Sequence, residues 1–282
     1  MIDILIDTII DAIKLIPFIF IAFLLIELFE HRINKKSEKI IEKSKKVGPL
    51  FGSILGIIPQ CGFSVFATNL YITRIISLGT LISIYLATSD EMLIIMISEQ
   101  VEMSLIFKVL FTKFIIGMIF GFIIDFIIRK EHIKEKKENY EICNDSHCHC
   151  DTDGVVVASL KHTLKIIMFI FIITFLVNIM MEYLGNDFIT KLFLKDNILS
   201  SFITSLIGLI PSCGSSVILT ELYIKGAIEF SSMIGGTLTN SGVALLVLFR
   251  NNKNMKENLF ILLLLYIIGV ISGVFLYLIW IK

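Results

Sequence analysis

Two cysteines occupy the same place in two nearly identical segments. Residues 56–72 read GIIPQCGFSVFATNLYI and residues 208–224 read GLIPSCGSSVILTELYI, with 11 of 17 aligned positions identical. Thiolates are soft ligands that suit borderline metals and trivalent metalloids. Cysteine is also a small apolar residue that tolerates burial. Because a Pro-x-Cys-Gly recurs in a chain with only five cysteines and four prolines, we predict that Cys61 and Cys213 bind the substrate.

Oxygen-bearing side chains follow each cysteine. Ser64 and Ser216 lie three residues on, on the same helical face, and are expected to add oxygen ligands or to cap freed backbone groups. Asn69 aligns with Glu221 near the end of each segment. A carboxylate costs about 2.5–3.5 kcal/mol at the centre of a bilayer but little at its surface. Both locations remain open for Glu221.

Two polar tetrapeptides interrupt apolar runs. TSDE contains Asp90 and Glu91, and the corresponding TNSG contains Asn240 and Ser241. Acids inside an apolar run mark an ion or proton pathway, unless the run ends early and leaves them near the outer surface. We expect all four residues to contact the substrate, with Lys113 as a partner for one of the acids.

A run of metal-capable side chains lies between the two segments, made of Cys143, His147, Cys148, His149 and Cys150. Cys/His-rich tracts bind metals, but this spacing is not that of a structural zinc site. The sequence predicts an accessory tract that captures or senses metal. The alternative is a solvated loop whose thiols stay free in the reducing cytosol.

The composition is that of a multi-pass membrane protein. Hydrophobic residues make up 56% of the chain, and the mean hydropathy is +0.87. Long apolar runs match the roughly 20 residues that a membrane-spanning helix needs; they cover Ile4–Leu28, Ile75–Ile97, Leu105–Ile128, Leu164–Leu184 and Leu259–Ile281. The chain lacks metalloprotease, hydrolase and P-loop motifs. We therefore expect no enzyme activity, no ATP-driven transport, no resident cofactor and no nucleic-acid partner; the expected partner is membrane lipid.

The charges of the loops predict their sides of the membrane. Basic residues gather at 31–47, 129–137 and 250–256, whereas the only charged residues at 98–104 are two glutamates. Basic loops stay cytoplasmic, so the first three are expected inside and the fourth outside. Both chain termini then lie outside.

This topology requires an odd number of crossings between residues 49 and 97, although two apolar segments lie there. The simplest solution makes Pro49–Tyr71 a re-entrant hairpin and Ile75–Ile97 the span. Proline and glycine supply the breaks that such hairpins need; the residues concerned are Pro59, Gly62, Pro211 and Gly214.

The same plan recurs in both halves. We predict an all-α polytopic membrane protein with membrane repeats at 1–128 and 161–282 and a charged cytosolic linker at 129–160. An odd number of crossings in each repeat inverts the second relative to the first, so that the two hairpins meet near mid-membrane. About ten membrane segments result when each hairpin arm is counted.

The sequences IPQCGFS at 58–64, ATSDEM at 87–92 and HCHC in the linker resemble the ten-transmembrane heavy-metal exporters. Members of that family are labelled arsenic efflux proteins or manganese transporters, and the family is related to organoarsenical permeases. The resemblance covers essentially the whole chain. It implies a permease of the bacterial cytoplasmic (inner) membrane that exports a metal or metalloid.

The residues leave the substrate open. The cysteines favour a thiophile such as arsenite, whereas Asp90, Glu91 and Asn240 favour a hard ion such as manganese. Proton uptake by an acid would couple export to the proton gradient. Two other functions remain: a membrane thiol redox enzyme that uses Cys61 and Cys213, and an organic-anion permease.

Overall fold

The chain forms a bundle of helices in this computed structural model, which describes residues 47–58, 61–128 and 198–280. It also describes isolated positions, at 9–10, 13, 16–17, 20–21, 24, 160, 163–164, 167–168, 171–172 and 175. Five side chains within these ranges are left out, those of Cys61, Asp90, Glu91, Cys213 and Trp280. Pro59, the His/Cys tract and most of the predicted runs Ile4–Leu28 and Leu164–Leu184 lie outside the described residues.

The described part of the first half contains five helices. They are α3 (Gly48–Gly56), α4 (Cys61–Ile72), α5 (Leu78–Ala87), α6 (Asp90–Ser98) and α7 (Met103–Ile128).

The second half repeats this order. Its helices are α9 (Ile198–Gly208), α10 (Cys213–Ile224), α11 (Phe230–Thr239), α12 (Ala244–Asn251) and α13 (Met255–Trp280). Helices α10, α11 and α13 each begin 152 residues after α4, α5 and α7, and none of the described residues forms a strand.

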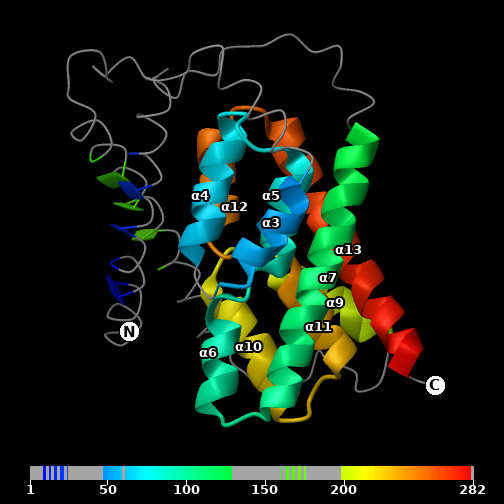
Figure 1. Ribbon diagram of the computed structural model, residues 1–282. Helices are drawn as coiled ribbons and strands as arrows, with labels where there is room; N and C mark the ends of the chain where they lie inside the picture. The colour runs from blue at the N-terminus through cyan, green and yellow to red at the C-terminus, as the bar shows by residue number, and fades with distance from the viewer. Residues whose placement is uncertain are drawn as a thin grey trace, which may run out of the picture.

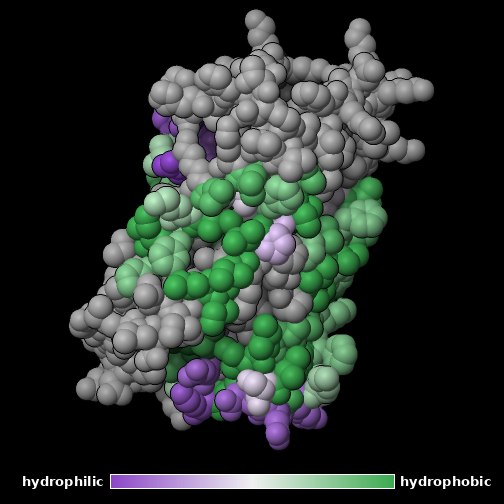
Figure 2. Space-filling view, turned by 90° about the vertical axis from the view of Figure 1, so that its left-hand side faces the viewer, coloured by the Kyte–Doolittle hydropathy of each residue, from purple (hydrophilic) through white to green (hydrophobic). Residues whose placement is uncertain are grey.

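Four helical stretches are long and apolar enough to cross a membrane, within the described residues. They cover Leu78–Ser98, Met103–Ile128, Phe230–Asn251 and Met255–Ile279. The sequence predicted the first, second and fourth as apolar runs. It missed Phe230–Asn251 as a run because polar residues around Asn240 lower its hydropathy. Figure 2 shows the apolar surface of the body, with hydrophilic residues at its lower end and others at its upper left edge.

Each half is held together by the same pairs of helices. Helix α5 packs against α3 and α7, and α11 packs in the same way against α9 and α13. The halves are joined chiefly by α4 with α12 and by α6 with α10. In Figure 1, α7 runs upward and α13 runs downward, so the two equivalent long helices have opposite directions.

Side chains from a neighbouring helix fix where α5 begins. Ser77 caps the helix by accepting a hydrogen bond from the amide of Thr80 at 3.2 Å. The Asp125 carboxylate of α7 accepts from the amide of Gly79 at 2.9 Å and from the Ser77 hydroxyl at 2.7 Å. A negative charge at a helix N-terminus is favourable, so Asp125 also fixes the position of α7 against α5.

Glycines allow the long helices α7 and α13 to approach the shorter helices of their own half closely. A Cβ atom at Gly117 or Gly121 of α7 would lie within 3.0 Å of the backbone of α5. Gly269 and Gly273 of α13 have equally close neighbours on α9 and α11. These glycines form the small-xxx-small pattern that brings membrane helices together.

We expect Gly79→Ala to destabilise the protein. Its methyl group would overlap the carbonyl oxygen of Gly121 and the carboxylate of Asp125. Overpacking of this kind costs about 1–3 kcal/mol, measurable as a lower midpoint of thermal unfolding in detergent. Gly214→Ala is the matched control, because the added atom would meet only the Ser212 hydroxyl at 3.4 Å. Equal midpoints for the two variants would contradict this packing.

Candidate substrate site at the helix breaks

Four interruptions of the helices lie near the middle of the body. They separate α3 from α4, α5 from α6, α9 from α10 and α11 from α12 (Figure 1). A break frees backbone N–H and C=O groups, which must find other partners. The breaks therefore collect polar side chains, and this layer is the candidate site.

The side chains around these breaks are polar and almost fully buried. Each is at most 3% exposed, and the set comprises Ser64, Thr68, Thr88, Ser89, Lys113, Ser212, Ser215, Ser216, Thr220, Thr237, Thr239, Asn240 and Ser241. Nearly all are neutral hydroxyl or amide groups. Such a layer can donate and accept hydrogen bonds at a depth where water is scarce.

Ser64 lies where two breaks meet. Its hydroxyl and that of Thr88 are 2.9 Å apart, so the first turn of α4 contacts the end of α5. Thr68 adds a second link, with 2.5 Å between its hydroxyl and that of Tyr85. In the second half, Ser216 accepts a hydrogen bond from Thr220 through its carbonyl at 2.7 Å. Ser64 and Ser216 thus lie in the buried layer at equivalent places.

The break between α11 and α12 is formed by Asn240, Ser241 and Gly242. The Asn240 side-chain oxygen accepts from the amide of Gly242 at 2.8 Å, which closes a tight turn. Gly242 has a φ of +56°, a conformation that glycine adopts without strain. The Asn240 side-chain nitrogen and the Ser241 hydroxyl are buried, and neither has a hydrogen-bond partner among the described residues. Buried polar atoms of this kind call for a partner such as a ligand or water.

Lys113 crosses the centre of the layer from α7. Its ammonium donates to the carbonyl oxygen of Thr88 and, at 3.1 Å, to that of Thr237. These carbonyls come from the ends of α5 and α11. The lysine therefore joins the two broken spans, a role that the sequence had not indicated.

The cysteines and the acids are located by their backbone. Cys61 is the first residue of α4 and Cys213 the first of α10. Asp90 and Glu91 are the first two residues of α6. Negative charge near the N-terminus of a helix is favourable. All four positions border the breaks. Their side chains are not among the described ones.

The structure describes three of the four predicted hairpin-break residues. Gly62 is buried in the first turn of α4, and Pro211 lies in the turn before α10. The amide of Gly214 donates to the Ser212 hydroxyl at 3.2 Å, which caps α10. The polar turn residues thus satisfy part of the freed backbone.

Asn69 and Glu221 align in sequence but have different surroundings. Asn69 is 3% exposed and accepts a hydrogen bond from Asn251 of α12 at 3.1 Å. Glu221 is partly exposed and forms an ion pair with Lys225, one turn along, at 2.9 Å. The hydrogen bond that the Lys225 ammonium donates to Glu221 raises the pKa of Lys225. Both residues lie near the outer ends of α4 and α10, away from the breaks at which these helices begin.

A polar cluster that sequence reasoning missed joins the two halves at one end of the bundle. Arg74 contacts the Glu257 carboxylate through two hydrogen bonds of 2.8 and 3.1 Å. Tyr71 donates to the same carboxylate, and Asn252 does so at 3.3 Å. Burial alone would lower the pKa of Arg74, but Glu257 raises it. The arginine therefore stays charged.

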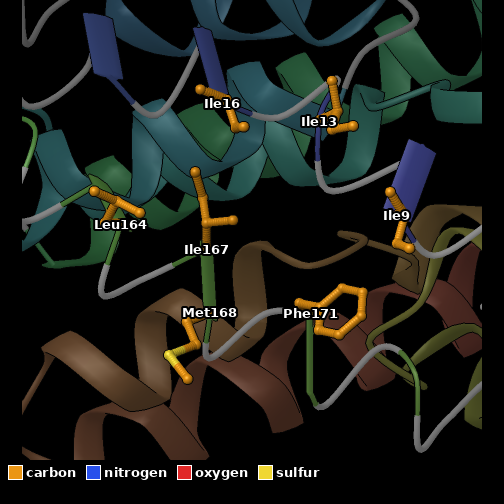
Figure 3. A pocket seen from close by; sticks show the side chains of 7 residues that line it. All are labelled: Ile9, Ile13, Ile16, Leu164, Ile167, Met168 and Phe171. Atoms are coloured by element: carbon orange, nitrogen blue, oxygen red, sulfur yellow. The ribbon is translucent and has the colours of Figure 1, made fainter.

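One cavity near the N-terminal residues differs from the buried layer. It has a volume of about 440 Å³, and only apolar side chains line it (Figure 3); they are Ile9, Ile13, Ile16, Leu164, Ile167, Met168 and Phe171. Among the described lining residues, only the Met168 thioether could contact an ion, and it is a weak acceptor. The polar layer is therefore the better candidate site.

Comparisons with known proteins give one match. The sequence matches the model of a family described as "Putative, 10TM heavy-metal exporter" over residues 1–188 and again over 145–280. No curated protein and no solved structure matches the chain.

We expect Arg74 and Glu257 to stabilise the contact between the halves. A double-mutant cycle with Arg74→Met and Glu257→Gln should give a coupling of about 1.5 kcal/mol, because hydrogen bonds to charged groups are worth more than neutral ones. Denaturant unfolding in mixed micelles measures it. The Glu221–Lys225 pair is the control; it lies within one helix region and is more exposed, so its coupling should be smaller. Equal couplings would contradict the assigned role.

Proposed function

This chain belongs to the family of ten-span heavy-metal exporters, and from that premise we propose that it is a secondary-active transporter. It exports a metal or metalloid of the manganese or arsenic class across the cytoplasmic membrane. The observation that carries the proposal is the buried polar layer at the four helix breaks. A polar site between broken helices at mid-membrane is the arrangement that secondary transporters use.

The arrangement of the helices supports an inverted repeat. The helix order recurs at a spacing of 152 residues, and the equivalent helices α7 and α13 run in opposite directions (Figure 1). Helices α3 and α4 lie in the upper half of the body, whereas α9 and α10 lie in the lower half. Two re-entrant hairpins that enter from opposite sides account for these positions.

Alternating access follows from such a repeat. The halves meet through α4 with α12 at one end and through α6 with α10 at the other. Opening one seam while the other closes would expose the polar layer to each side in turn. The Arg74–Glu257 cluster closes the seam at the end that the basic loops assign to the cytoplasm.

Cys61 and Cys213 supply the soft ligands in this proposal. Both residues begin a helix, α4 and α10, so their backbones lie at two equivalent breaks. Hydroxyl and amide groups of the layer, such as Ser64, Ser216 and Asn240, would complete the contacts. Asp90 or Glu91 would take up a proton as the substrate leaves.

Substrate should protect the two thiols from alkylation. We would label vesicles of a Cys143→Ser, Cys148→Ser, Cys150→Ser variant, in which only Cys61 and Cys213 remain. Arsenite or manganese should slow their labelling several-fold, and Cys61→Ser with Cys213→Ser should abolish export. Labelling that no substrate alters would count against a thiol site. A Cys61–Cys213 disulfide formed during turnover would instead favour a redox enzyme.

The acids should couple export to protons. Vesicles with Asp90→Asn and Glu91→Gln should lose substrate-driven proton movement, because neither amide can release a proton. Fluorescence of a pH-sensitive dye measures it. Glu99→Gln with Glu102→Gln is the control, since these acids lie in the turn between α6 and α7. Proton exchange at the normal rate in the first variant would refute the coupling.

A further inference from the structure

Arg74 has a backbone conformation that is unfavourable for arginine. It lies in the turn after α4, and its φ is +61°. The residue at the equivalent place after α10 is Gly226, whose φ is +68°. Glycine adopts this left-handed region freely, whereas a residue with a Cβ atom is strained there. Because glycine would suit the turn better, the arginine side chain must contribute a contact that outweighs the strain.

That contact is an ion pair between the two halves. The Arg74 guanidinium donates two hydrogen bonds, of 2.8 and 3.1 Å, to the two oxygens of the Glu257 carboxylate in the first turn of α13. Tyr71 of α4 and Asn252, which follows α12, donate to the same carboxylate. The Glu257 side chain is 16% exposed. A bidentate pair within a hydrogen-bonded network stabilises a contact more than an isolated surface ion pair does.

The repeat does not contain this pair twice. The positions equivalent to Arg74 and Glu257 in the other half are Gly226 and Leu105, and neither side chain can form an ion pair. The turns after α4 and α10 therefore share their backbone conformation but not this contact. The arginine and the glutamate serve one of the two seams between the halves, the one where α4 packs against α12.

The same seam contains buried amides whose hydrogen bonding is incomplete. Asn69 of α4 accepts from Asn251 of α12 at 3.1 Å, but its own side-chain nitrogen has no partner among the described residues. Asn258 of α13 donates to the carbonyl oxygen of Asn252 at 3.0 Å, and its side-chain oxygen has no partner there either. Asn69 is 3% exposed and Asn258 is fully buried. Water would satisfy both atoms in an open seam, so their hydration favours opening.

We propose that Arg74 and Glu257 form the latch of a gate at this seam, which the basic loops assign to the cytoplasmic side. The latch holds α4 against the start of α13 while the seam is closed. Its two hydrogen bonds break before the polar layer becomes accessible from the cytoplasm, and hydration of the buried amides offsets part of the cost. This inference rests on the proposed transport function and adds the contact that controls access to the site.

The test measures the side of the membrane from which the thiols at the helix breaks can be labelled. The full-length variant with Cys143→Ser, Cys148→Ser and Cys150→Ser retains only Cys61 and Cys213. A charged maleimide that does not cross membranes reaches them from the cytoplasmic face in inside-out vesicles and from the outer face in right-side-out vesicles. Mass spectrometry gives the labelling rate, which requires neither substrate nor transport.

Arg74→Gly and Glu257→Gln are the test variants in this background. Glycine relieves the strained turn, so a purely structural role of Arg74 predicts unchanged labelling. Loss of the latch should instead raise the rate from the cytoplasmic face about tenfold, because hydrogen bonds to charged groups are the stronger ones. Glu257→Gln should act in the same way and decides the matter if Arg74→Gly fails to fold. Lys225→Met is the control, since it removes an exposed ion pair one turn in length, and it should change neither rate.

Unchanged labelling in the latch variants would overturn the proposal. An equal rise from both faces would overturn it too, because it would indicate a general loosening of the bundle. Export is a separate measurement. If the wild type exports arsenite or manganese while the latch variants label normally, only the latch is refuted. If the wild type moves neither substrate, the proposed export function fails, and the labelling comparison still decides whether the latch exists.

Discussion

A helix that breaks inside a membrane must find new partners for its backbone groups, and this requirement shapes the whole bundle. Lys113 meets it for the ends of α5 and α11 by donating to Thr88 and Thr237. Ser212 and Asn240 meet it locally by capping α10 and closing the turn before α12. Since hydrocarbon offers no hydrogen bonds, a helix can stay broken only where protein groups such as these replace the lost backbone hydrogen bonds. The polar layer is thus both the structural solution and the candidate site.

The two halves share their backbone plan but differ in their charged side chains. Lys113 has Leu265 as its counterpart, and the buried Asn69 has the ion-paired Glu221. The Arg74–Glu257 contact joins the halves at one end of the bundle. Identical scaffolds therefore present different polar groups to the centre and to the two seams.

Sequence reasoning located the breaks well and their contacts poorly. The tetrapeptides around Asp90 and Asn240 do interrupt long apolar helices, and Ser64 and Ser216 do lie in the buried layer. The span Phe230–Asn251 escaped notice because its polar centre masks its hydropathy. The pairing of Lys113 with Asp90 or Glu91 stays a prediction, because those two side chains lie outside the described residues. The described partners of Lys113 include backbone carbonyls, which no residue pattern reveals.

The sequence by itself determined the helical class, the duplicated plan and the family, because long apolar runs and Pro or Gly breaks act through local chemistry. Only the tertiary structure decided which breaks meet and which polar groups pair. Tyr71 and Glu257 are 186 residues apart, and Lys113 and Thr237 are 124 residues apart. Contacts between residues so far apart in sequence depend on how closely packed helices cross. Glycines such as Gly117 and Gly121 set the distance between the helices that they join.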